Sequence, residues 1–401
     1  MSKRATIIAG LVAVLAAMCT APAEAGAKKK PATADATKLG DLRTKAYFDI
    51  NKIVWPNPPA IARIKFVDLF TGEKVDPNQF SKQNRRPKQK WMDRLAGAQN
   101  VNEIDAGKLP FQLIRTYGLA FDSKGRIYAA DQGVGAVFIF DPKTKTVEMI
   151  RNGKEAHFGL IMGLAIDDDD RMFVSDAKLH RVLVLSSQHE QLASVGMDVL
   201  VNPGGLAIDR ENRLLYVVDT GNDTVVVFDA DSFKKLRNIG KPSRKHTATD
   251  PGSFSLPTNV AVDSEGDVYV TDTFNNRVQI FDADGEFLGA FGKNGDGPGH
   301  FERPKGIAVD CDRHIWVVDA AQDRVKVFDR EGRLLIYFGE HGEYPGRFMG
   351  AYGIAIDKEN RVAVSETFPG RVQMFRYVND AEAEAEMARR ATGSQTNGGT
   401  R

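Results

Sequence analysis

Cysteine and histidine are scarce in this sequence of 401 residues, which contains 2 cysteines and 7 histidines. Cys19 lies near the N-terminus, and the other cysteine is Cys311. If the N-terminal segment is removed, one cysteine remains and no internal disulfide can form. No two histidines have the spacing of metal ligands. The histidines and cysteines therefore do not predict a zinc site.

A charge excess of either sign is also missing, because 54 lysines and arginines balance 53 aspartates and glutamates. Removal of Lys3, Arg4 and Glu24 with an N-terminal leader would make the two numbers equal. Proteins that bind nucleic acids usually carry a basic excess or a basic face. The dense basic runs, 28–30 and 82–90, precede the repeats described below. We interpret them as solvated charge and predict no nucleic-acid partner.

Long apolar runs are missing as well. The stretch from Ile7 to Met18 is shorter than the roughly 20 residues that a membrane-spanning helix needs. Basic residues precede this stretch and Ala23-Glu-Ala25 follows it, as in a secretory signal peptide at 1–25. We expect cleavage after Ala25, no transmembrane segment, and a periplasmic or extracellular protein, with envelope association left open. A lipoprotein anchored at Cys19 is the alternative, although lipoprotein processing needs a small residue where Met18 stands.

The sequence is rich instead in copies of one short pattern, an apolar strand that ends in Asp. The six copies are Gly118–Asp122, Gly163–Asp167, Gly205–Asp209, Asn259–Asp263, Gly306–Asp310 and Gly353–Asp357. They are about 40 to 55 residues apart, which indicates a repeat array or a propeller. After a tight turn, a second apolar strand ends in Asp, or in Glu366 in the last copy. The fourth turn residue is Gly, Asn or Asp in five copies, as a left-handed turn position requires.

Each repeat contains two further strands. Third strands such as 277–282 carry polar residues and are predicted to lie further from the centre, and fourth strands such as 286–292 complete a sheet. Four-stranded sheets repeated around a channel form a β-propeller. We therefore predict an all-β, six-bladed propeller with four-stranded blades over 108–380.

The sixth repeat runs out of chain after Tyr377 before a fourth strand. We predict that the alternating segment 62–70 supplies this strand and closes the ring, within a region 61–107 that also contains a short helix at 89–96. The three prolines in 53–59 predict that this end of a flexible leader, 26–60, has no regular structure. Residues 381–401 are predicted to form a disordered or helical tail.

Longer stretches of the repeats resemble the NHL-repeat family. They are Leu256–Asp263, Asp272–Asp282 and Gly292–Gly306. The Trp-Pro-rich lead-in at 53–59 is similar to that of bacterial exported six-bladed propellers of this type. Copies two and six depart from the pattern, at Leu185 and Glu366. Six-bladed relatives include amidating lyases with zinc and lactonases with calcium, so the resemblance implies such an enzyme as one alternative.

Loops that enter the first strands and loops that join second to third strands emerge on one face of a propeller. Binding residues concentrate on such loops, and exposed aromatic residues beside lysines suit a protein or peptide partner. The predicted partner-binding residues are Tyr117, Met162, Lys178, Phe274, Lys305, Tyr352 and Phe368. Packing of Tyr117 and Tyr352 at the channel mouth is the alternative for these two. The insertion 241–255 is a second candidate contact.

The twelve acids that end the first and second strands are the main candidates for a metal site. They recur in every copy, whereas a metal site is asymmetric, so we predict that they cap turns, with one or two left to line a cation site. No nucleophile-elbow motif is present. We therefore predict a non-catalytic scaffold in an extracytoplasmic assembly, without a cofactor. A lyase or lactonase with a Ca or Zn ion in the channel is the alternative.

Overall fold

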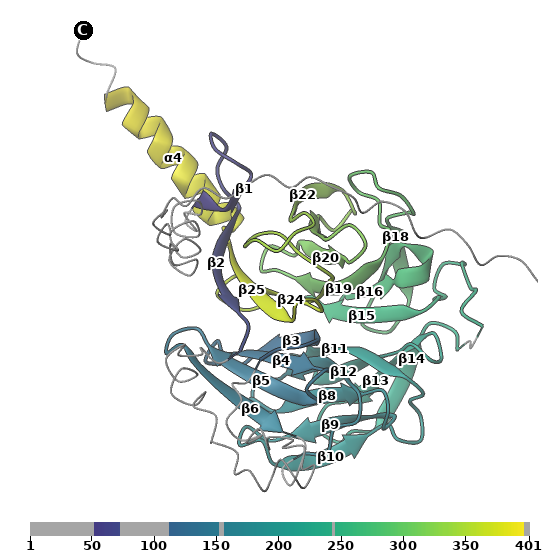
Figure 1. The fold of residues 1–401 in the computed structure, drawn as a ribbon. Helices are drawn as coiled ribbons and strands as arrows, with labels where there is room; N and C mark the ends of the chain where they lie inside the picture. The colour runs from purple at the N-terminus through teal and green to yellow at the C-terminus, as the bar shows by residue number, and fades with distance from the viewer. Residues whose placement is uncertain (1–51, 73–111, 152–155, 243–244, 397–401) are drawn as a thin grey trace, which may run out of the picture. The chain divides into compact units, whose positions relative to one another are not determined.

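The computed structural model describes residues 52–72, 112–151, 156–242 and 245–396. The predicted signal peptide and the predicted helix at 89–96 lie outside these ranges. Within them, no helix is long and apolar enough to span a membrane. The strands form six antiparallel sheets arranged as blades (Figure 1).

The first three blades follow one another along the chain. Blade one contains β3 (Thr116–Phe121), β4 (Ile127–Asp131), β5 (Ala136–Asp141) and β6 (Thr146–Arg151). Blade two contains β7 (Ile161–Ile166), β8 (Met172–Asp176), β9 (Arg181–Leu185) and β10 (Gln191–Val195). Blade three contains β11 (Pro203–Asp209), β12 (Leu214–Asp219), β13 (Thr224–Asp229) and β14 (Lys235–Ile239).

The remaining blades repeat this order. Blade four contains β15 (Pro257–Val262), β16 (Val268–Asp272), the 3-10 turn η2 (Thr273–Asn275), β17 (Arg277–Phe281) and β18 (Phe287–Phe291). Blade five contains β19 (Pro304–Val309), β20 (Ile315–Asp319), β21 (Arg324–Phe328) and β22 (Leu334–Phe338). Blade six contains β23 (Ala351–Ile356), β24 (Arg361–Glu366) and β25 (Arg371–Tyr377) from the C-terminal end.

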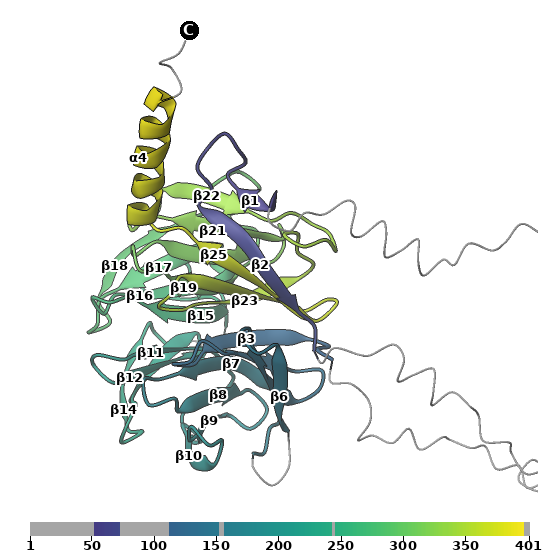
Figure 2. The same cartoon turned by 90° about the vertical axis from the view of Figure 1, so that its left-hand side faces the viewer.

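Blade six is completed from the N-terminal side, as predicted. Strand β2 (Ile64–Phe70) pairs antiparallel with β25, with Ile64 opposite Tyr377 (Figures 1 and 2). A register shift between Phe66 and Asp68 leaves Val67 exposed, while Ile64 and Phe66 are buried. The prediction of an all-β, six-bladed propeller closed by an N-terminal strand is therefore confirmed.

The prediction that 53–59 has no regular structure is wrong for its start. Strand β1 (Val54–Trp55) pairs with β2 as a fifth strand of this sheet. The first proline, Pro56, follows the pair, so both strand residues keep their backbone N–H groups. The Trp55 ring centroid lies 5.3 Å from that of Phe338 and 6.0 Å from that of Phe375. These ring contacts place β1 against the junction of blades five and six.

The hydrophobic core is divided among the junctions between blades. Six clusters each combine buried residues of two neighbouring blades, as when Phe173 of blade two packs with Leu215 of blade three. The second strands are buried on both faces, as predicted. Third strands are also largely buried, including the polar Gln279, Lys326 and Gln373. Each fully buried large apolar side chain stabilises the fold by about 1.5 to 3 kcal/mol.

The glycine that opens most first strands is explained by close backbone contact around the channel. A Cβ atom added to Gly353 would lie 2.1 Å from the carbonyl oxygen of Tyr117, and one added to Gly306 would lie 2.4 Å from that of Tyr352. Cβ atoms do not approach other atoms so closely in real structures. Neighbouring first strands therefore meet backbone to backbone, which places the residues before these glycines around one opening.

The turn prediction holds in four copies and needs a correction in two. Arg313 adopts a positive φ of 64° at the fourth turn place although it is neither Gly, Asn nor Asp. In blade three the positive φ falls on Arg213 and not on the predicted Asn212. This turn is one residue longer, and β12 begins directly after Arg213. Ion pairs of both arginines to the preceding blade hold these left-handed positions.

The tail, which was predicted to be disordered or helical, forms helix α4 (Asp380–Thr396) (Figure 2). It is anchored where it leaves the propeller. Arg63, next to β2, forms an ion pair with Asp380, and Ala383 is buried. The helix thus begins beside the β2–β25 pairing that closes the ring.

Candidate binding face and channel

The acids that end the second strands fasten the loops of one face. Asp131 accepts the backbone N–H groups of Ile114 and Arg115, at 2.7 and 2.9 Å, from the segment that enters β3. Its five counterparts make the same contact in the other blades; they are Asp176, Asp219, Asp272, Asp319 and Glu366. The predicted capping role of these acids is confirmed. The loops of this face are therefore held by buried carboxylates.

Blades four and six strengthen this fastening in the same way. Asp272 accepts hydrogen bonds from Arg277 Nε at 2.8 Å and from Gln279 Nε2 at 3.0 Å. In blade six, Glu366 accepts the equivalent bonds from Arg371 Nε at 2.6 Å and Gln373 Nε2 at 2.7 Å. Charge-assisted bonds of this kind are roughly twice as strong as neutral ones. The loops directly after these two acids are therefore held between charge-assisted bonds.

Each of these two loops presents an exposed phenylalanine. Phe274 is 64% exposed and Phe368 is 61% exposed, in the matching segments Thr273–Asn275 and 367–369. Large aromatic side chains are usually buried, so an exposed one on a fixed loop is informative. Two predicted site residues thus lie at equivalent positions of blades four and six.

Three other predicted site residues lie together at the mouth of the channel. Tyr117 and Tyr352 form an edge-to-face pair with ring centroids 4.4 Å apart. Lys305 Nζ lies 5.6 Å from the centroid of the Tyr352 ring. All three residues are half-buried. Burial raises the pKa of Tyr352, whereas burial, with the charge of Arg303, lowers the pKa of Lys305 to about 8.

The structure places the remaining predicted residues apart from this group. Met162 is half-buried at the mouth in blade two, where its sulfur accepts a hydrogen bond from Gln132 Nε2 at 2.9 Å. Lys178 is exposed on the loop after β8. Among the contacts of the described residues, none joins Lys178, Phe274 or Phe368 to the mouth. The predicted set therefore divides into residues of the mouth and residues of the surrounding loops.

Sequence reasoning missed three exposed apolar residues on the same face. Ile114, Val134 and Leu160 are 57%, 40% and 39% exposed, on the loops that enter β3, follow β4 and enter β7. A Cβ atom added to Gly133 would lie 2.7 Å from Ile114 Cβ, so these two loops touch. With Phe368 they form an apolar arc, defined as Phe368, Ile114, Val134 and Leu160, over blades six, one and two. The sequence feature that could have identified these residues is an apolar residue within a polar loop.

The insertion 241–255 is described except for 243–244. His246 Nδ1 lies 2.7 Å from Asp223 Oδ1, and the Ser255 hydroxyl donates a hydrogen bond to the His246 carbonyl oxygen at 2.5 Å. The first contact ties the insertion to blade three, and the second joins two residues within the insertion. Its predicted role as a second contact remains a prediction.

The opposite end of the channel opens into a cavity of about 680 Å³ that touches all six first strands. Its wall includes apolar strand residues such as Leu119, Leu164 and Ile307. Charged turn residues such as Asp168, Arg210 and Lys358 surround its opening. These charges pair with one another, as in the contact of 3.3 Å between Lys358 Nζ and Asp168 Oδ1.

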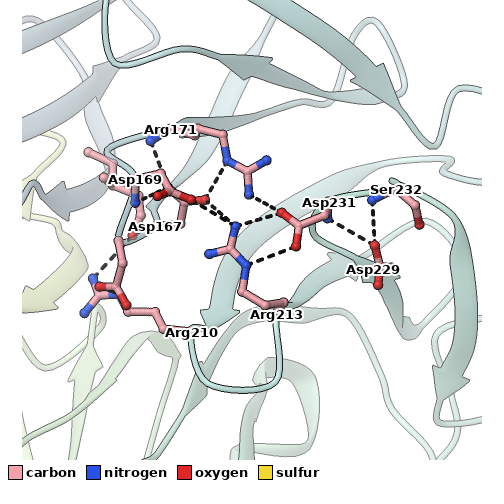
Figure 3. A network of polar contacts seen from close by, with 10 residues as sticks. Asp167, Asp169, Arg171, Arg210, Arg213, Asp229, Asp231 and Ser232 are labelled. Carbon is pink, nitrogen blue, oxygen red and sulfur yellow. Dashed lines mark hydrogen bonds and ion pairs between the residues drawn. The ribbon is translucent and has the colours of Figure 1, made fainter.

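A larger network satisfies the charges between blades two and three on that side (Figure 3). Arg213 Nη2 lies 2.7 Å from Asp231, 3.3 Å from Asp169 and 3.4 Å from Asp167. Arg171 also bridges Asp167 and Asp231, at 2.7 and 2.8 Å. The hydrogen bond from Arg213 lowers the pKa of Asp231 to about 2. A ligand at this site would have to compete with existing ion pairs.

The described carboxylates at the ends of the first strands are engaged by their own turns. The first-strand acids hold their own turns; Asp122 accepts the N–H of Arg126 at 2.8 Å and Asp167 accepts that of Arg171 at 2.8 Å. Over the described ranges, no three His, Cys, Asp or Glu side chains are grouped so that they could hold a metal ion.

Comparison with known proteins agrees with the fold. Residues 253–325 match a family described as "6-bladed beta-propeller". Human NHL repeat-containing protein 3 is 37% identical over 83 residues, which are 19% of this chain and 24% of that protein. The mouse protein of the same name is 27% identical over 203 residues, 44% of this chain and 54% of that protein. The chain thus spans about a quarter and about half of these two relatives.

Among solved structures, a gluconolactonase from Xanthomonas campestris superposes with a TM-score of 0.51 and 17% identity, over 66% of this chain and 87% of that one. An identity this low shows the fold alone. Together with the repeats, these findings show an NHL-repeat-like six-bladed β-propeller.

Proposed function

We propose that this propeller is a non-catalytic binding module, a scaffold that holds a protein or peptide partner on the face where the first strands begin. The observation that carries the proposal is the pair Phe274 and Phe368. Both rings are exposed, and each lies on a loop that hydrogen bonds to a buried acid hold in place. An aromatic residue on a fixed loop loses little conformational freedom when a partner covers it. Such residues typically dominate the binding energy of an interface.

The apolar arc adds to this surface. Single exposed apolar residues are normal on a protein, but neighbouring ones on several blades mark an interaction site. Ile114 and Val134 lie on loops that touch, and Phe368 and Leu160 extend the arc to the adjacent blades. Stable interfaces bury roughly 800 Å² on each partner. A partner that reaches from the arc across the mouth to Phe274 would contact both phenylalanines.

We also propose that this partner belongs to an extracytoplasmic assembly. The support is the order of charge, apolar run and small residues in 1–25, which is typical of a signal peptide. A protein exported in this way would meet its partner in the periplasm or outside the cell.

Site-specific photo-crosslinking in the native cell tests the proposed face. A benzophenone amino acid replaces Phe274 or Phe368 in the full chain, and Leu288 on β18, which is 53% exposed, serves as the control position. We expect both loop positions to crosslink the same protein and the control position not to do so. Equal crosslinking from all three positions, or none from the two loops, would overturn the proposed function.

A further inference from the structure

Lys305 places a cation at the channel mouth, where no described residue supplies an anion. Over the described ranges, no ion pair joins Lys305 to an acid, and the charged neighbour that acts on it is the positive Arg303. Lys326, a buried lysine of the same blade, shows the contrast, because its Nζ lies 3.3 Å from Asp319 Oδ2. Burying a charge without a partner is costly. Lys326 therefore has an acidic partner within the fold, whereas the ammonium of Lys305 can pair with a ligand.

The two tyrosines at the mouth add hydrogen-bond donors. Neither the Tyr117 hydroxyl nor the Tyr352 hydroxyl has a hydrogen bond to another described residue. Burial raises the pKa of Tyr352, so its hydroxyl keeps its proton at neutral pH and can donate. The ring of Tyr352 also contacts the Lys305 ammonium. Blades five, six and one thus contribute one lysine amine and two phenol hydroxyls to a single opening.

We propose that Lys305, Tyr352 and Tyr117 bind a carboxylate of the partner, either a peptide C-terminus or an Asp or Glu side chain. This inference rests on the proposed function and specifies the chemistry recognised at its centre. An ionised carboxylate only accepts hydrogen bonds, and it carries the single negative charge that one lysine matches. A phosphate group carries a higher charge and would be better served by several arginine forks or a helix N-terminus, whereas Arg303 is the one other charged group that acts on Lys305 among the described residues.

The proposal predicts how binding depends on pH. A bound carboxylate stabilises the charged amine and so raises the pKa of Lys305 above its free value of about 8. Affinity should be constant near neutral pH and should fall as the pH rises through about 8. The other ionisable groups at the mouth are Arg303 and the phenols of Tyr117 and Tyr352.

The test uses the full chain and three acetylated peptides of the same length. The first has a free C-terminal carboxylate, the second is its amide, and the third is the amide with one internal Glu. Calorimetry measures affinity, and mass spectrometry measures how fast acetic anhydride modifies Lys305. We expect the free acid or the Glu peptide to bind and to slow the modification, and the plain amide to do neither. Whether the free acid or the Glu peptide binds shows whether the carboxylate comes from a C-terminus or from an acidic side chain.

Three variants complete the test. Lys305→Met should weaken binding of the acidic peptide roughly tenfold to hundredfold, as the loss of a charge-assisted bond does. Tyr352→Phe, which keeps the ring and removes the hydroxyl, should weaken it by a smaller factor. Lys235→Met, at an exposed lysine of the outer strand β14, should bind like the parent protein. Equal affinity for acid and amide, or for Lys305→Met and the parent, would overturn the carboxylate site.

The carboxylate site and the proposed partner face can be overturned independently of each other. If crosslinking at Phe274 and Phe368 fails while the acidic peptide protects Lys305, the partner face is wrong and the carboxylate site is supported. If crosslinking succeeds and the partner binds Lys305→Met as tightly as the parent protein, the carboxylate site alone is overturned.

Discussion

The Ser365 hydroxyl in the last blade donates a hydrogen bond of 2.6 Å to the carbonyl oxygen of Tyr117 in the first blade. Thr271 makes the same bridge from blade four, to the carbonyl oxygen of Lys305 at 2.8 Å. Ser175 makes it from blade two to blade three. Because the acceptors include the backbone of two mouth residues, these hydroxyls fix the mouth as well as the ring.

Replacing Ser365 with alanine should destabilise the fold by about 1 to 3 kcal/mol, because the carbonyl oxygen of Tyr117 and the N–H of Gly353 lose a buried partner. Urea unfolding measures the difference. Ser264→Ala, at an exposed turn serine, is the matched control and should be nearly neutral. Equal stability of the two variants would show that the bridge does not hold the ring.

Replacing Phe66 with alanine should open the seam between β2 and β25. The Phe66 ring is buried and meets Phe375 edge to face at 5.6 Å, so its removal should cost about 3 to 5 kcal/mol. The adjacent Val67 is 44% exposed, and Val67→Ala should cost less than about 1 kcal/mol. Thermal unfolding compares them. Coinciding melting curves would contradict the role of β2 as the closing strand.

Stability should depend on the protonation of His314. Burial would lower the pKa of His314, but the hydrogen bond and charge of Asp310, with Asp380 and Asp312, outweigh it and raise the pKa. The charged imidazole therefore stabilises the fold below the unfolded pKa of about 6.5, and this contribution disappears as the pH rises through the higher folded pKa. The loss of unfolding free energy in His314→Gln should be larger near pH 5.5 than near pH 9. A loss that is independent of pH would contradict this assignment.

The proposed export predicts a shortened protein. Terminal sequencing of the chain from the native envelope or periplasm should find a start near Gly26, as the small residues at Ala23 and Ala25 require. An intact Met1 on that material would contradict export. A lipid on Cys19 would establish the lipoprotein alternative in its place.

The sequence predicted the blades because each carries its own local signals, namely the period-two strands, the turn residues and the closing acid. It also predicted β2, whose alternation stands outside the repeats. Strand β1 could not be predicted, because Val54 and Trp55 become a strand only through non-local contacts with β2, Phe338 and Phe375. The buried Gln279 likewise reads as an exposed polar residue until its bond to Asp272 is seen.

For the site, the sequence placed Tyr117 and Tyr352 at the mouth because the residue before each first-strand glycine occupies the same place in every blade. It could not show that the two rings touch, because side-chain direction depends on neighbouring blades. Nor could it separate Lys305 from Lys326, since the difference is the distance to an acid. The exposure of Ile114 was missed because a loop gives no periodic pattern.

If the partner binds across Phe274 and Phe368, the affinity of a double alanine variant shows this most directly. With the crosslinked partner purified, calorimetry should show that Phe274→Ala with Phe368→Ala weakens binding roughly hundredfold or more, as loss of two dominant contacts does. The unfolding free energy should change by only about 0.5 kcal/mol per site, because both rings are exposed. The control, Leu236→Ala with Leu288→Ala on the outer strands, should bind like the parent. Parental affinity in the phenylalanine variant, or an equal loss in the control, would contradict the account.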